Sequence, residues 1–168
     1  MKREPIAFLS ISPTSARAGT SSLSETAKGI DKLIRTCKTM LKKTEDPVTI
    51  RELQRRIGVF WLKREDGKAD TRKSHWYLEK SVEAGSPAAK EDLLEALWAD
   101  ESTPDEEVLQ MARERRVEGS PMALAVLGMA HKDGRGVKKN PARAKQLLWH
   151  ASRKGVDWAK KELRSIEE

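Results

Sequence analysis

The sequence has little cysteine, phenylalanine or tyrosine. Cys37 is the only cysteine among 168 residues, which excludes an internal disulfide and a cysteine-rich metal site. There are only two phenylalanines and one tyrosine, while Ala, Leu, Lys, Arg and Glu are abundant, and this balance favours helices over a sheet. The length suits one domain with a sizeable core. The composition therefore predicts a single all-α domain.

Long apolar runs are also absent. No segment approaches the roughly 20 apolar residues that a membrane-spanning helix requires. Lys2 and Arg3 precede the apolar stretch IAFLSI, as in a secretory signal, but this stretch is short and Glu4 and Pro5 interrupt its start. We expect a cytoplasmic protein, with export as the open alternative. Residues 1–23, rich in Ser, Thr and Gly, predict a flexible tail before a helical domain at 24–168.

Five of the seven prolines follow a residue that caps helices. The pairs are Asp46-Pro47, Ser86-Pro87, Thr103-Pro104, Ser120-Pro121 and Asn140-Pro141. The first residue of each pair offers an acceptor for an unpaired backbone amide, and proline fits the first helical turn. Thr103 with Glu106 also predicts a capping box. Ser22, Asp70 and Asp157 supply three further starts, giving about eight helices.

Three glycines reveal an internal repeat. Gly85, Gly119 and Gly155 lie 34 and 36 residues apart, and each is expected to end a helix in the left-handed conformation. Each is followed by alanine four residues later and by leucine eight residues later. These positions are Ala89, Ala123, Ala159, Leu93, Leu127 and Leu163. A shift of 70 residues also aligns Gly58 with Gly128. The period predicts stacked helical hairpins at about 47–85, 86–119 and 120–155, with a capping helix at 157–167.

The last unit resembles a known family. The stretch MALAVLGMAHKDGRGVKKNPARAKQLLWHASRKG is similar to a Sel-one-like repeat, a relative of the tetratricopeptide repeat. Residues 54–85 match the pattern weakly, and residues 86–119 keep only its ends. The resemblance implies a right-handed solenoid of about three hairpins with an N-terminal helix and a C-terminal cap. It also implies an adaptor that binds other proteins.

The glycines of this unit raise the question of a phosphate-binding loop. Gly134, Arg135 and Gly136 are followed by neither the Gly-Lys-Ser/Thr of a Walker loop nor the third glycine of a dinucleotide loop. We therefore predict that Gly134 and Gly136 are turn residues between paired helices.

The residues also argue against catalysis. His75, His131 and His150 do not share the helical spacing of a metal site, and no nucleophile-elbow sequence is present. We expect no catalytic residues, no metal and no cofactor.

Charge is distributed unevenly along the chain. The net charge is +7 over residues 1–69, −6 over 70–119 and +6 over 120–168. The acidic candidates for partner binding are Glu91, Asp92, Glu95, Asp100 and Glu101, and the basic candidates are Lys138, Lys139 and Arg143. The acidic group is open to a second interpretation as a solvated helix face, and the basic group could contact phosphates.

The tryptophans add candidates of a different kind. The helical period turns Trp149 away from the face that Leu148 occupies, and Trp98 beside Leu97 is similar. Both are candidate hot spots for a partner. Trp61 and Trp76 are expected to pack between hairpins.

Two functions follow from these patterns. The first is a non-catalytic module that binds a protein partner on a charged helical-repeat surface. The alternative is a nucleic-acid-associated protein that uses the basic C-terminal repeat. The acidic and basic segments also suggest head-to-tail self-association.

Overall fold

The computed structural model describes residues 20–64 and 70–166, with side chains from residue 28 onwards. Within these ranges it contains eight helices and no strand. The helices are α1 (Thr20–Leu41), α2 (Pro47–Leu62), α3 (Thr71–Glu83), α4 (Pro87–Ala99), α5 (Asp105–Val117), α6 (Pro121–Asp133), α7 (Pro141–Arg153) and α8 (Asp157–Arg164). The predicted all-α fold is confirmed.

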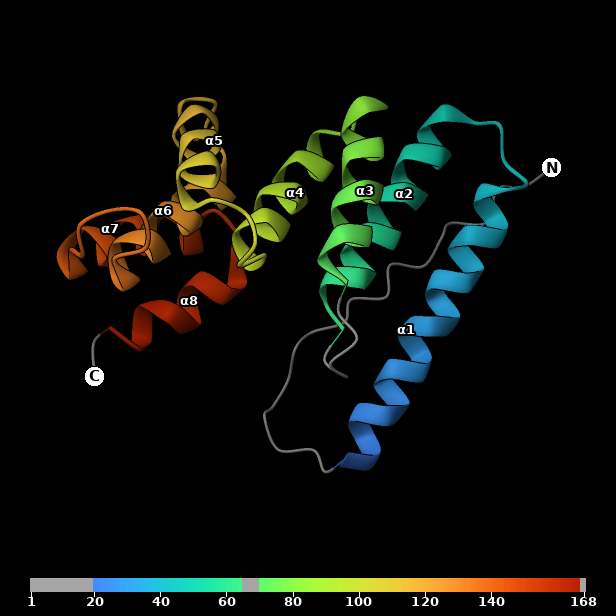
Figure 1. Cartoon of the computed structure of the whole chain (residues 1–168), viewed down its shortest axis with the longest axis horizontal. Coiled ribbons are helices and arrows are strands. Elements are labelled where there is room, and N and C mark those ends of the chain that lie inside the picture. Colours follow the sequence, from blue (N-terminus) through green and yellow to red (C-terminus); the bar gives the residue numbers. More distant parts are fainter. Residues whose placement is uncertain (1–19, 65–69, 167–168) are drawn as a thin grey trace.

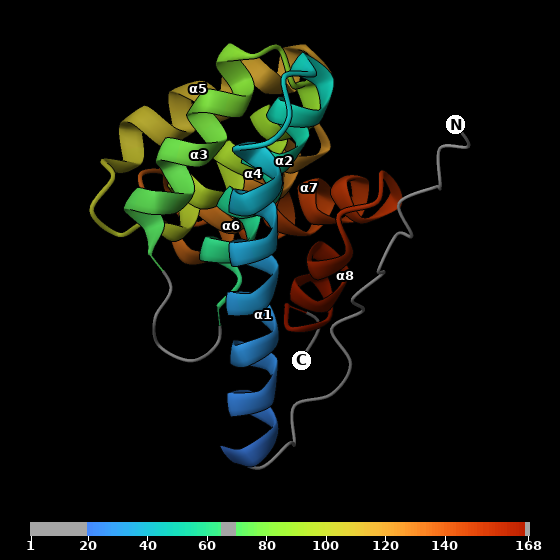
Figure 2. The ribbon, with the colours of Figure 1, turned by 90° about the vertical axis from the view of Figure 1, so that its right-hand side faces the viewer.

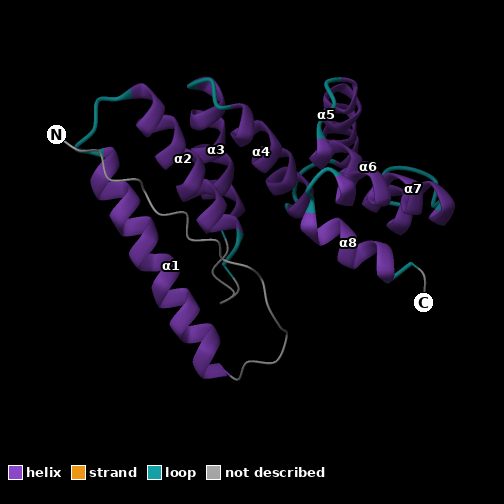
Figure 3. Ribbon diagram, turned by 180° about the vertical axis from the view of Figure 1, so that it is seen from behind, coloured by secondary structure: helices purple, strands orange, loops and turns teal. Residues whose placement is uncertain are grey.

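The helices form three consecutive pairs arranged in a row. The pairs are α2 with α3, α4 with α5 and α6 with α7 (Figure 1). Helix α1 packs against α2 at one end of the row and α8 packs against α7 at the other. Figure 2 shows that α1 extends well beyond the helices it contacts, and Figure 3 shows the same row of helices from behind. This row is the solenoid that the repeat predicts.

Most helix starts follow the local capping rule. The side chains of Asp46, Ser86, Ser120 and Asn140 each accept a hydrogen bond from the backbone N–H three residues later, and a proline follows in the first turn. Asp70 caps α3 in the same way. These predicted starts are confirmed.

Two predicted helix starts are wrong. Thr103 does not cap α5, because the helix begins at Asp105 with Pro104 in the cap position. The short preceding loop is instead folded around Asp100, whose carboxylate accepts bonds from Ser102. Val156 occupies the cap position of α8, and this helix begins at Asp157 as predicted.

The second wrong start is at the other end of the chain. Helix α1 begins at Thr20, ahead of the start expected at Ser22. Of the flexible tail predicted at residues 1–23, residues 1–19 lie outside the described residues.

The helix ends depend on glycine, as expected. Gly85, Gly119 and Gly155 have φ of 82°, 88° and 96°, and a side chain would strain this left-handed backbone. Gly134, with φ of 76°, ends α6, and Gly136 has φ of 66°. The predicted turn is confirmed.

The first and third hairpins are closed by a glycine that meets a leucine. A Cβ on Gly58 would lie 2.6 Å from Cγ of Leu78, and one on Gly128 would lie 2.8 Å from Cγ of Leu148. Both leucines are fully buried. The missing side chain therefore lets the two helices of each hairpin approach closely.

The loops of these two hairpins also share a backbone bond. The Asp70 N–H donates to the Trp61 carbonyl at 3.3 Å, and the Asn140 N–H donates to the His131 carbonyl at 2.8 Å. Donors and acceptors both lie 70 residues apart, so the repeat extends to the hydrogen bonds.

The middle hairpin departs from this pattern. Leu94 stands 34 residues before Gly128, at the equivalent place in the repeat, and it is fully buried. A leucine there holds α4 and α5 further apart, so α5 makes more of its contacts with α6. Leu94, Val108, Leu109 and Ala112 join buried residues of α6 in one apolar cluster.

None of the eight helices in the described ranges combines the length and the apolar character that crossing a bilayer demands.

The glycine–leucine contact yields a test of the hairpin geometry. We expect Gly128→Ala to lower the free energy of unfolding by up to about 2 kcal/mol, because an overpacking cost of roughly 1–3 kcal/mol outweighs a gain of about 1 kcal/mol in helix propensity. Urea denaturation measures the change. Gly29→Ala in α1 is the matched control, since a Cβ there meets no atom within 4 Å, and it should stabilise the protein by up to about 1 kcal/mol. A Gly128→Ala variant as stable as the Gly29→Ala variant would contradict the proposed contact.

Candidate functional site

The acidic run of α4 is engaged mainly in contacts within the protein. The Glu91 carboxylate accepts hydrogen bonds from Arg115 at 2.7 Å, from the Ser120 hydroxyl at 2.6 Å and from the Met122 backbone N–H at 3.1 Å. Burial alone would raise the pKa of Glu91, but these three bonds together lower it. Glu91 therefore ties α4 to the end of α5 and to the start of α6.

Asp92 and Asp100 are also held internally. Arg55 of α2 donates to Asp92 at 2.6 Å, and burial still raises the pKa of Asp92 against the effect of this bond. The Asp100 carboxylate accepts bonds from Ser102, which lower its pKa. It also lies 3.8 Å from Nδ1 of His75. Glu91, Asp92 and Asp100 are therefore engaged in contacts within the chain, and their role in binding a partner stays a prediction.

Two acidic candidates differ from these three. Glu101 is exposed and has no polar partner among the described residues. Glu95 is half-buried and forms no hydrogen bond or ion pair with any described residue. Burial raises the pKa of Glu95, and the nearby positive charge of Lys63 only partly opposes this effect. A head-to-tail contact between copies through α4 would thus compete with bonds that most of its carboxylates already make.

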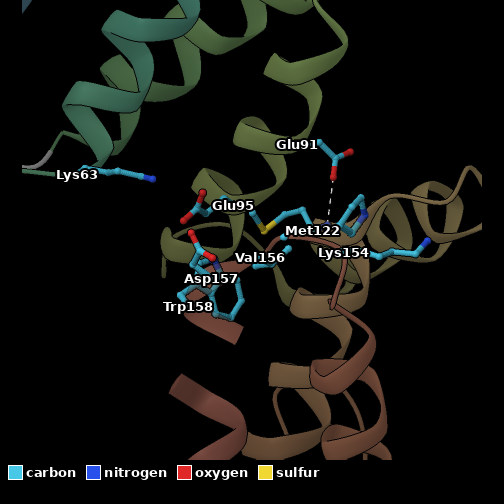
Figure 4. Close-up of a pocket in the computed structure, with 10 residues that line it drawn as sticks. Lys63, Glu91, Glu95, Met122, Lys154, Val156, Asp157 and Trp158 are labelled. Atoms are coloured by element: carbon cyan, nitrogen blue, oxygen red, sulfur yellow. Dashed lines mark hydrogen bonds between the residues drawn. The ribbon is translucent and has the colours of Figure 1, made fainter. Parts of the chain in front are cut away.

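Glu95 lies in an open pocket of about 560 Å³. The pocket is formed by the end of α2, by α4, by the start of α6 and by the turn between α7 and α8. Its lining residues are Lys63, Glu91, Glu95, Pro121, Met122, Lys154, Gly155, Val156, Asp157 and Trp158. Figure 4 shows the Glu95 and Asp157 side chains turned toward the same part of this pocket, beside Met122 and Trp158.

The apolar side of the pocket was not predicted from the sequence. Met122 packs against both C-terminal apolar clusters, and Trp158 packs beside the buried Val156. Only a weak sequence signal points to Met122 and Trp158. Met122 follows Gly119 and Trp158 follows Gly155, and these two glycines occupy equivalent positions in successive repeats, so the residues after them lie along one edge of the row. Trp158 was not among the candidate hot spots.

The four tryptophans follow their predicted positions only in part. Trp149 is 46% exposed, as expected, with the Arg153 guanidinium 5.1 Å from its ring centre. Trp76 is 54% exposed and does not pack between hairpins, because it lies on the outer side of α3. Trp98 is partly buried against the core, and Arg135 lies 4.2 Å above its ring. Trp61 packs with the first apolar cluster.

The basic candidates lie on another part of the surface. Lys138 and Lys139 in the α6–α7 loop are exposed and form no ion pair with a described residue. Arg143, at the start of α7, donates to Gln146 at 2.8 Å. None of these residues lines the pocket, so the structure separates the basic candidates from Glu95.

The glycine-rich loop before α7 makes a structural contact. The Arg135 side chain donates to the Asp105 carboxylate and, at 2.7 Å, to the Trp98 carbonyl. A Cβ on Gly136 would meet Leu109 at 2.6 Å. The loop therefore joins the third hairpin to the second, and its arginine is already occupied.

No group of three or more His, Cys, Asp and Glu side chains in the described part of the chain is arranged to hold a metal ion.

The Glu91 contacts yield a test of the junction beside the pocket. We expect Glu91→Gln to lower the free energy of unfolding by about 1–3 kcal/mol at pH 7, because a charge-assisted set of bonds is lost. Since folding lowers the pKa of Glu91, its stabilisation is complete above the unfolded-state pKa of about 4.3 and is lost as pH falls through the folded-state value. Urea denaturation at several pH values should therefore show the variant and wild type converging in acid. Glu79→Gln, at an exposed position of α3, is the control and should change stability by less than about 0.5 kcal/mol. A constant difference at all pH values would contradict this role for Glu91.

Comparisons with known proteins were made for the sequence and for the fold. No family model matches the chain, and no curated protein matches it. One solved structure that resembles it is a protective antigen of uropathogenic Escherichia coli strains that displays a Sel-one-like repeat fold, with 21% identity, a TM-score of 0.48, and coverage of 86% of this chain and 35% of that one. Another is a Sel-one repeat protein from Oxalobacter formigenes, with 20% identity, a TM-score of 0.43, and coverage of 86% and 49%. The chain thus spans about a third to a half of these proteins, and its similarity to Sel-one-like repeat proteins is one of fold alone.

Proposed function

We propose that this protein is a non-catalytic module that binds a segment of a protein partner in the pocket between α4, α6 and α8. The observation that carries the proposal is the lining of this pocket. Apolar surface from Met122, Val156 and Trp158 lies beside the half-buried Glu95, which forms no hydrogen bond or ion pair with a described residue. Apolar surface with a few oriented polar groups is typical of binding sites.

The surrounding helices support binding without rearrangement. Glu91 joins α4, α5 and α6, and the Arg55–Asp92 pair joins α2 to α4. A preformed site loses little conformational entropy when a ligand arrives. We therefore assign binding to this pocket.

A second candidate function is nucleic-acid binding on the basic surface. Its support is the exposed Trp149 together with Arg153, Lys138 and Lys139, which make no ion pair with described residues. An exposed aromatic ring and exposed cations suit a nucleotide base and its phosphates. None of these four residues lines the pocket, so substitutions at Lys138 and Lys139 can be compared with a block of the pocket.

The test blocks the pocket without changing its interior. Lys154→Cys places a thiol at the exposed rim, and a maleimide-linked polymer attached there should cover the opening. Cys37 is buried, so the new thiol is the preferred target. We expect the blocked protein to lose at least tenfold in its capture of partner protein from a lysate of its source cells, measured by quantitative mass spectrometry after nuclease treatment. Glu79→Cys with the same polymer is the control and should retain capture.

The opposite pattern would favour the second candidate. Capture that vanishes with nuclease and falls steeply with salt, and that Lys138→Glu with Lys139→Glu abolishes, indicates phosphate contacts. Equal capture by the blocked Lys154→Cys and Glu79→Cys proteins would overturn the pocket as the binding site.

A further inference from the structure

We infer that the pocket recognises a basic side chain of its partner, with Glu95 and Asp157 as the two carboxylates that receive a lysine or an arginine. This inference rests on the proposed function, because it names the chemistry of the segment that the pocket would bind. It begins from the positions of the two carboxylates. Glu95 comes from α4 and Asp157 from the first turn of α8, and both line the same pocket (Figure 4).

The charges around the pocket leave these two carboxylates unbalanced. Of the acidic groups facing Glu95, Glu91 is paired with Arg115 and Asp92 with Arg55. Asp157 is exposed and, like Glu95, has no polar partner among the described residues. The pocket is therefore lined by two carboxylates that no described cation neutralises through an ion pair.

The two lysines that line the pocket do not form ion pairs with Glu95 or Asp157. Lys63 is exposed at the end of α2 and forms no ion pair with Glu95, although its charge acts on that carboxyl. The Lys154 ammonium donates to the Gly119 carbonyl at 3.3 Å. Both lysines belong to the rim, so a cation from outside has access to the carboxylates between them.

A cation from the partner would offset the desolvation cost of the Glu95 carboxylate. A half-buried carboxylate without a partner is destabilised by lost hydration, and its burial raises the pKa of Glu95. A partner's lysine or arginine supplies the missing charge at the moment of binding. Arginine is the better fit, because its planar fork can donate to two carboxylates at once.

The apolar lining fits the rest of a basic side chain. Long basic side chains pack their methylene stems on apolar surface while the charged end reaches a polar group. Met122, Val156 and Trp158 provide that surface next to the two carboxylates. The partner segment therefore carries a lysine or arginine with an apolar neighbour.

The test selects peptides without presupposing their charge. A library of random 12-residue peptides is selected on the intact wild-type protein, and fluorescein-labelled forms of the enriched peptides are measured by fluorescence anisotropy. We expect the enriched peptides to share a lysine or arginine beside an apolar residue. Glu95→Gln should weaken their binding at least tenfold and Asp157→Asn severalfold, whereas Glu79→Gln should leave it unchanged.

Two further readouts separate recognition from a folding defect. Glu95→Gln removes a carboxylate that burial disfavours, so its Tm should equal or exceed that of wild type. Because the pKa of Glu95 is raised, peptide binding to wild type should weaken with falling pH earlier than an ordinary glutamate would allow. The groups that face Glu95 are Lys63, Glu91, Asp92, Lys154 and Asp157, and the Glu95→Gln variant, which retains all five, gives the baseline for this effect.

Two results would overturn the inference and are distinguishable. Peptides that the polymer on Lys154→Cys displaces, but that lack a shared cation or bind Glu95→Gln equally well, would leave the pocket as a binding site and refute the basic side chain. Enriched peptides that the polymer does not displace would refute the pocket itself.

Discussion

The junction made by Glu91 determines how the second half of the molecule is arranged. In the outer hairpins a glycine lets two helices approach until a buried leucine touches the backbone opposite. Leu94 prevents that approach in the middle hairpin, and the Arg115–Glu91 pair joins α4 to α5 instead. The same carboxylate also binds the Ser120 hydroxyl and the Met122 amide at the start of α6. A charged group thus replaces a close apolar contact, and the pocket lies directly beside it.

The sequence predicts local features well and distant pairings poorly. The caps at Asp46 and Asn140 and the terminator at Gly155 depend on a few neighbouring residues, so they can be recognised in one repeat. The assignment at Thr103 failed because Asp100 organises the short loop first. The internal contacts of the acidic run were missed for a different reason: the cations that neutralise Glu91 and Asp92 lie 24 and 37 residues away in the chain. Charge counting along a sequence cannot show such pairs.

The candidate site was even harder to predict, because it too is formed by residues that are distant in the sequence. Glu95 was included among the acidic candidates, but its neighbours Met122 and Trp158 come from two other helices, and neither has a motif that marks it. The helical period also does not determine which tryptophans are exposed. Trp98, for example, is covered by Arg135 from the next hairpin. Where a side chain lies thus depends on the neighbouring unit as well as on its own helix. The pocket and the basic surface around Lys138 consequently became distinct only in three dimensions.

The contact of Arg135 with the preceding hairpin bears on how the molecule unfolds. In arrays whose units touch only their neighbours, the strength of each interface decides whether units melt one at a time or together. Arg135 adds a charge-assisted bond to Asp105, a bond to the Trp98 carbonyl and a stacking contact on the Trp98 ring at a single interface. We therefore expect the second and third hairpins to unfold together, with their amide protons exchanging with solvent as a group.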